Sequence, residues 1–204
     1  MKKVFLSTLL ILNVSFIYAE SPGSFRGKET HGVGFGIIGS GLGGGLFYDY
    51  AINSDMKIHV SAVSGGLSRG SGGTTLETSS STIGATFRYF PSQDFGWFVG
   101  AGGGMLSASQ SMKQYLYSSS SGTYTTTTTD STYSGLGLWT DLGWQGYDGY
   151  YFTIGARIGT SMKLSEDDKT DEIINVVDHQ STAKMDWDTY KSPTGMIMTF
   201  GWHF

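Results

Sequence analysis

The sequence has no cysteine and only three prolines, and charged residues make up 15% of its 204 residues. Without cysteine, the chain has no disulfides, no thiolate metal site and no lipid-modified N-terminal cysteine. The charged fraction is well below the roughly 25% that is typical of soluble domains. Beyond the N-terminus, no stretch approaches the roughly 20 apolar residues that a transmembrane helix needs. The sequence therefore does not match an ordinary soluble domain or a helical membrane protein.

The residues that are abundant point to another class of membrane protein. The chain has 31 glycines and 14% aromatic residues, and its mean hydropathy is slightly negative, at −0.12. A helical membrane protein with so few charged residues would have a clearly positive mean hydropathy, so the low charge and the negative mean hydropathy do not fit that class together. They agree in a transmembrane β-barrel, where half of each strand faces lipid and half faces a polar lumen.

The N-terminus has the pattern of a secretory signal peptide. Lys2 and Lys3 precede an apolar run from Val4 to Ile17, and Ala19 supplies a small residue before a cleavage site ahead of Glu20. The run is too short for a transmembrane anchor. We expect a cleaved signal peptide over 1–19.

Removal of this peptide makes the chain more acidic. Two of the 13 basic residues are lost and none of the 17 acidic ones, so the net charge falls from −4 to −6. This charge argues against a nucleic-acid partner. We expect a short polar segment over 20–30, followed by one domain over 31–204.

From His31 onward the apolar residues recur at every second position, and helical spacing is nowhere sustained. Short connections of three or four residues follow the second, fourth and sixth segments, and long ones follow the third, fifth and seventh. The first connection is short and glycine-rich and departs from this pattern. Eight segments with alternating connections predict an all-β, eight-stranded, antiparallel up-and-down transmembrane barrel. The segments are about 31–39, 43–52, 56–65, 77–90, 95–110, 133–146, 150–164 and 190–204.

The outward positions nearest the short connections are all aromatic, which is typical of a girdle at a membrane interface. A soluble β-sandwich also alternates, but it gives no reason to collect aromatic rings at one end. We therefore expect a periplasmic aromatic girdle made of Tyr48, Tyr50, Phe87, Tyr89, Phe95, Trp97, Trp144, Tyr150, Phe152, Trp202 and Phe204.

The last ten residues, GMIMTFGWHF, alternate up to a terminal phenylalanine. With Phe200, Trp202 and Phe204, this tail resembles the C-terminal assembly signal of bacterial outer-membrane proteins. The whole mature chain resembles the small eight-stranded outer-membrane barrels: the OmpA transmembrane domain, OmpX and the opacity proteins. The resemblance implies a place in the bacterial outer membrane, contact with lipid and lipopolysaccharide, and insertion by the β-barrel assembly machinery through Phe204.

Inward positions carry charges that an eight-stranded lumen is too narrow to leave solvated. By parity these are Asp49, Lys57, His59, Arg88, Asp141, Arg157 and Lys163. Buried charges must pair, so we expect Arg88 and Arg157 to meet Asp49 and Asp141 and to close the lumen. Which acid each arginine chooses is not readable from the sequence. The alternative is a narrow conducting pore.

No residue pattern points clearly to catalysis or to a cofactor. The histidines are scattered, and the acidic stretch SEDDKTDE over 165–172 matches no spaced calcium loop. His179 and Ser181 share only their spacing with the lipid A deacylases of the PagL type. We therefore expect a non-enzymatic barrel without cofactors. Its surface loops, chiefly 108–132 and 165–189, would serve adhesion to a host or environmental surface, or envelope integrity. A lipid A-modifying enzyme is the alternative.

Overall fold

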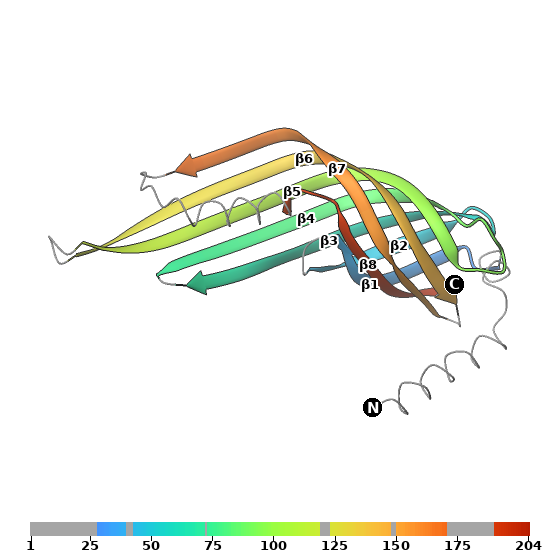
Figure 1. The fold of residues 1–204 in the computed structure, drawn as a ribbon. Helices are drawn as coiled ribbons and strands as arrows, with labels where there is room; N and C mark the ends of the chain where they lie inside the picture. The colour runs from blue at the N-terminus through green and yellow to red at the C-terminus, as the bar shows by residue number, and fades with distance from the viewer. Residues whose placement is uncertain (1–27, 40–42, 72, 119–122, 148–149, 171–189) are drawn as a thin grey trace, which may run out of the picture.

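The computed structural model describes residues 28–39, 43–71, 73–118, 123–147, 150–170 and 190–204. Each strand pairs antiparallel with the next, and β8 pairs with β1, so the sheet closes into an up-and-down barrel of eight strands (Figure 1). This confirms the predicted barrel. The strands are β1 (His31–Gly39), β2 (Gly44–Ala51), β3 (Met56–Ser71), β4 (Thr74–Tyr89), β5 (Trp97–Ser118), β6 (Thr123–Tyr147), β7 (Tyr150–Thr170) and β8 (Gly195–His203).

The wall of the barrel is much taller on one side than on the other. Strands β5, β6 and β7 have 22, 25 and 21 residues, whereas β1, β2 and β8 have 8 or 9. The pairing of β2 with β3 ends at Gly44 and Ser64. The pairing of β8 with β7 begins at Gly195 and Arg157. Strands β3 to β7 continue beyond these points as a twisted sheet that extends away from the closed ring (Figure 1). We call this extension the protruding sheet.

The protruding sheet corrects the expected loops. The region 108–132 is largely a hairpin of β5 and β6, the Gly/Ser-rich stretch around 66–76 belongs to β3 and β4, and β7 runs through 165–170. These stretches lack apolar alternation because both of their faces are polar, so periodicity gave no strand signal. Threonine nevertheless favours strands, and cross-strand pairing satisfies the backbone.

At the opposite end of the barrel, short turns join β2 to β3, β4 to β5 and β6 to β7. The structure places the aromatic residues expected for the girdle at this end, on the outer surface. Ten of them are 38–63% exposed, and Trp144 is half-buried. Phe35 and Phe200 contact Trp202, with ring centroids 6.4 and 5.1 Å away, so aromatic contacts continue along the outer face of β1 and β8.

The outer surface changes from apolar to polar along one line of paired residues. The last outward apolar residues of β3 to β7 pair with one another across the sheet: Ala62, Ile83, Met105, Leu136 and Met162. Two positions further toward the protruding sheet, or three on β7 because of a register shift, the next set of partners consists of serines: Ser64, Ser81, Ser107, Ser134 and Ser165. We call this set the serine row. Below it the outer face is mostly apolar, with Thr140 and Thr160 as exposed exceptions, and above it hydroxyl side chains dominate.

Three expectations concern parts of the chain outside the described residues. The signal peptide over 1–19 lies there, together with most of the polar segment 20–30 and the short connection 40–42. Within the described residues, no helix is long and apolar enough to cross a bilayer.

Candidate functional site

In each strand every second side chain points inward, and these side chains fill the lumen. Trp139 on β6 lies across the lumen above two glycines: a Cβ at Gly84 or Gly102 would collide with its indole ring. Trp139 Nε1 donates a 2.8 Å hydrogen bond to Thr86 Oγ1. The glycines of β4 and β5 thus make room for a ring that a narrow barrel could not otherwise hold.

The first of two buried polar groups centres on Asp141, and we call it the Asp141 cluster. Arg157 on β7 donates from Nε to Asp141 Oδ1 at 2.8 Å and from Nη2 to Oδ2 at 3.0 Å, a bidentate pair. Arg88 on β4 approaches the same carboxylate, with Nη2 3.7 Å from Oδ2. The Arg157 guanidinium lies 4.2 Å above the Trp139 ring, and that of Arg88 lies 4.6 Å above the Phe98 ring. One carboxylate therefore serves two arginines.

The second group, the Asp49 cluster, lies nearer the short turns. Lys57 Nζ is 3.5 Å from Asp49 Oδ2 and donates to Gln145 Oε1 at 3.2 Å and to Tyr147 Oη at 3.0 Å. It also lies 3.1 Å from His203 Nε2. Because an ammonium can only donate, this nitrogen accepts, and His203 is neutral in this arrangement. His59 Nδ1 donates to Asp49 Oδ1 at 2.6 Å.

The structure separates the charges that the sequence placed together. Among the described residues both arginines pair with Asp141 and neither pairs with Asp49, whose partners are Lys57 and His59. Lys163, also assigned to the lumen by parity, instead has a side chain that is 61% exposed. It lies beyond Arg157, the last residue of β7 that pairs with β8, where no opposite wall encloses the inner face of the sheet.

Three members of the Asp49 cluster were missed from the sequence: Gln145, Tyr147 and His203. All three occupy inward positions, so strand parity was the signal that could have found them. Tyr147 was assigned to a turn instead. An amide and a phenol carry no charge at neutral pH, so Gln145 and Tyr147 did not enter an argument that was based on charged side chains, and His203 was considered only as part of the C-terminal tail and among the scattered histidines.

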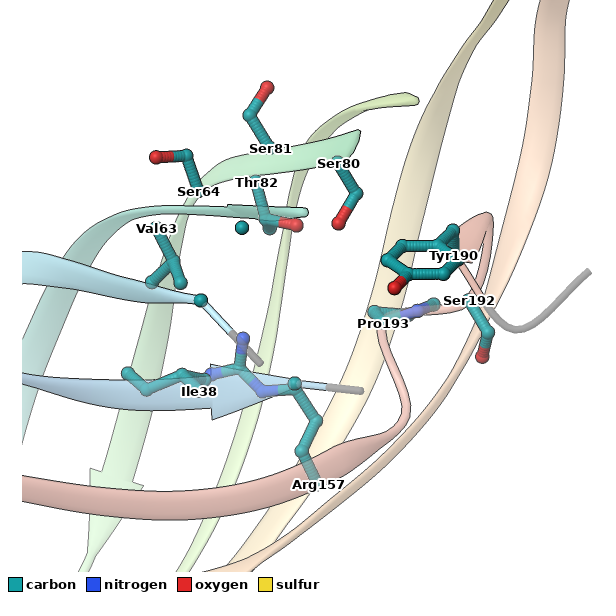
Figure 2. Close-up of a pocket in the computed structure, with 13 residues that line it drawn as sticks. Ile38, Val63, Ser64, Ser80, Ser81, Thr82, Arg157, Tyr190, Ser192 and Pro193 are labelled. Atoms are coloured by element: carbon teal, nitrogen blue, oxygen red, sulfur yellow. The ribbon is translucent and has the colours of Figure 1, made fainter. Parts of the chain in front are cut away.

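A small pocket opens at the wide mouth of the barrel, where the protruding sheet begins (Figure 2). Its walls come from the ends of β1 and β2, from β3 and β4, and from the segment 190–194, which precedes β8. Tyr190 in this segment packs against Leu106, Ala108 and Tyr133, and Lys191 pairs with Glu166 at 3.0 Å. The thirteen lining residues are Ile38, Gly39, Gly43, Val63, Ser64, Gly65, Ser80, Ser81, Thr82, Arg157, Tyr190, Ser192 and Pro193.

The other candidate chemistry from the sequence concerns a His/Ser pair and metal-binding side chains. His179 and Ser181 lie outside the described residues. In the part of the chain that the structure describes, no group of three or more histidine, aspartate or glutamate side chains is arranged to hold a metal ion.

Comparison with known proteins identifies no family for this chain. No protein-family model matches it, and no curated protein matches it. Among solved structures, the crystal structure of Acinetobacter baumannii CarO is similar with a TM-score of 0.40 and 13% identity, over 85% of this chain and 96% of that chain.

Proposed function

We propose that this protein is a non-enzymatic β-barrel of the bacterial outer membrane. In this proposal the closed ring spans the lipid, the protruding sheet presents an interaction surface outside the cell, and buried ion pairs close the lumen. The observation that carries the proposal is the outer surface of the ring, which is apolar between the aromatic residues at the short turns and the serine row.

The dimensions of this apolar surface fit a bilayer. The paired stretches from Trp97 to Met105 and from Leu136 to Trp144 match the roughly 9–11 residues that a tilted transmembrane strand needs. Large apolar side chains such as Leu138 and Ile158 are 64% and 68% exposed. A continuous exposed surface of this kind needs an apolar environment, and lipid supplies it around the whole circumference.

The protruding sheet is the part best suited to meet a partner. Outer-membrane barrels have short periplasmic turns and long extracellular connections, so the end with the protruding sheet would face the exterior. Its Ser and Thr hydroxyls both donate and accept hydrogen bonds, as in the contact between Ser79 and Ser109 at 2.7 Å. Such a surface suits glycans, lipopolysaccharide or a host or environmental surface, and supports a role in adhesion or envelope integrity.

Single-cysteine labelling tests the insertion and the orientation, because the chain has no native cysteine. In intact cells, a membrane-impermeant maleimide should label Ser111→Cys in the protruding sheet but not Asp94→Cys at a short turn. Permeabilisation of the outer membrane should make Asp94→Cys reactive. Leu138→Cys, on the apolar face, should stay unlabelled in both conditions. Labelling of Asp94→Cys in intact cells would reverse the proposed orientation, and ready labelling of Leu138→Cys would exclude lipid contact.

Deletion of Phe204 should impair assembly in the outer membrane. This residue is 63% exposed beside the short turns, and its backbone exchanges hydrogen bonds with His31, at 3.1 and 2.8 Å. The deletion removes an aromatic anchor and the end of the proposed assembly signal. Immunoblots of outer-membrane fractions should show a lower level of the protein, while Phe204→Tyr, which keeps the ring, should assemble. Normal levels of the truncated protein would contradict this role.

Two further experiments distinguish the proposal from its alternatives. A narrow pore would give ion conductance in planar bilayers, whereas a lumen closed by buried ion pairs should give none. A lipid A-modifying enzyme would change the lipid A mass spectrum between cells with and without the gene. The proposal expects identical lipid A in both.

A further inference from the structure

The buried charges of the lumen do not balance, and the excess is confined to one place. In the Asp49 cluster, Lys57 faces one carboxylate, His203 is neutral, and His59 adds no charge as the neutral tautomer that donates from Nδ1. In the Asp141 cluster, two guanidinium groups share one carboxylate. The second cluster therefore carries one positive charge in excess. Arg88, Arg157 and Asp141 are almost completely buried, and a charge removed from water needs compensation.

Of the two arginines in this cluster, Arg157 is the one that reaches the pocket at the wide mouth. Arg88 does not line the pocket, and its Nε, Nη1 and Nη2 are buried without hydrogen-bond partners among the described residues. The Nε and Nη2 of Arg157 are held by Asp141, and Nη2 also donates to Thr86 at 3.2 Å. Nη1 has no hydrogen-bond partner among the described residues, and Arg157 lines the pocket at the wide mouth. Figure 2 shows its guanidinium rising from β7 into the space beside Ile38. The Arg157 guanidinium thus forms the charged floor of the pocket, and the pocket opens toward the side of the protruding sheet.

The rest of the pocket suits a small anion. Arg157 is the one charged residue among the thirteen described residues that line it, and none of these thirteen is a carboxylate that would repel an anion. Ser80 and Thr82 are at inward positions of β4 and can donate hydroxyl hydrogen bonds. The cavity volume of the pocket is about 20 Å³, and a single water molecule needs roughly 10–15 Å³ of such volume. One small ion fits, and a bulky ligand does not.

We propose that the pocket at the wide mouth binds one small monovalent anion, with Arg157 as its charged floor and Ser80 and Thr82 as hydroxyl donors. The anion is a free halide or the carboxylate end of a small acid. Its charge neutralises the excess of the Asp141 cluster. The proposal does not depend on what the protruding sheet contacts, since it concerns only the ring and its mouth.

Chloride NMR on the full-length protein in detergent tests this site. The ³⁵Cl linewidth should increase with wild-type protein, and bromide should reverse the effect. Arg157→Gln should weaken binding at least about tenfold, as expected when a charged hydrogen bond is lost. The matched control is Lys163→Gln, which removes an exposed cation of the same strand and should bind chloride as the wild type does. The site is refuted if the wild type broadens no more than Arg157→Gln.

Two further variants keep the test decisive if Arg157→Gln does not fold. Arg88→Met removes the excess charge without touching the pocket, and it should weaken chloride binding several-fold. Thr82→Leu leaves the Asp141 cluster intact but fills the pocket, and it should abolish binding. Unchanged binding in both variants would overturn the proposal.

Competing anions distinguish the two sources of the negative charge. Acetate should displace chloride if a carboxylate end can enter the pocket. Gluconate, which is too large, should not displace it at the same ionic strength. Displacement by bromide but not by acetate assigns the pocket to free halides. Displacement by gluconate would contradict the small pocket as the binding site.

Discussion

Replacing Asp141 with alanine is expected to destabilise the barrel by on the order of 3–5 kcal/mol, the cost of removing one partner of a buried ion pair. The substitution leaves Arg88 and Arg157 as two buried cations without a carboxylate between them. Urea unfolding in lipid vesicles, followed by tryptophan fluorescence, should show a clearly lower midpoint.

The arginine partners refine this expectation. Arg157→Ala should cost more than Arg88→Ala, because Arg157 makes two charged hydrogen bonds and Arg88 makes only a 3.7 Å contact. The double variant Arg157→Ala/Asp141→Ala should recover part of the loss, since one stranded cation is gone. Lys163→Ala is the control: its exposed pair with Glu166 should contribute only about 0–1 kcal/mol. An open, water-filled lumen predicts unchanged midpoints for all of these variants and altered ion selectivity instead.

Replacing Lys57 with methionine is expected to be about as destabilising, by on the order of 3 kcal/mol or more. Methionine keeps the length of the side chain but leaves the buried Asp49 carboxylate without its cation. It also removes the donor to Gln145 and Tyr147 and the cation above the Tyr151 ring, 5.1 Å from its centroid. The same unfolding measurement applies.

A double substitution distinguishes the cost of removing one charged partner from the contribution of the whole ion pair to stability. Lys57→Met combined with Asp49→Leu replaces both charges by apolar groups, and it should recover much of the stability, because apolar replacement of a whole buried pair is often neutral. Lys113→Met, at an exposed position of the protruding sheet, should leave the midpoint unchanged. If the double variant is as unstable as Lys57→Met alone, the stranded carboxylate is not the cause.

The barrel itself could be predicted from the sequence because a lipid-facing wall imposes a period of two on every strand. That period placed Val33 and Phe35 on one face of β1 and Asp49 and Arg88 on the inner face of their strands. Side-chain direction in a strand is a local property, fixed by the pleat. Local information was therefore sufficient for the strand count, for the outward aromatic residues and for most of the lumen charges.

The tertiary structure alone decided how far the strands extend and which charges meet. The Ser/Thr stretches on both sides of 119–122 have no apolar alternation, and they become strands because neighbouring strands pair with them. Both arginines contact Asp141 and not Asp49 because of the cross-strand register. This register pairs Arg157 with Asp141 and Arg88 with Lys57. Register joins residues that are distant in the chain, so no local pattern encodes it. The position of the excess positive charge, below the pocket at the wide mouth, follows from that register.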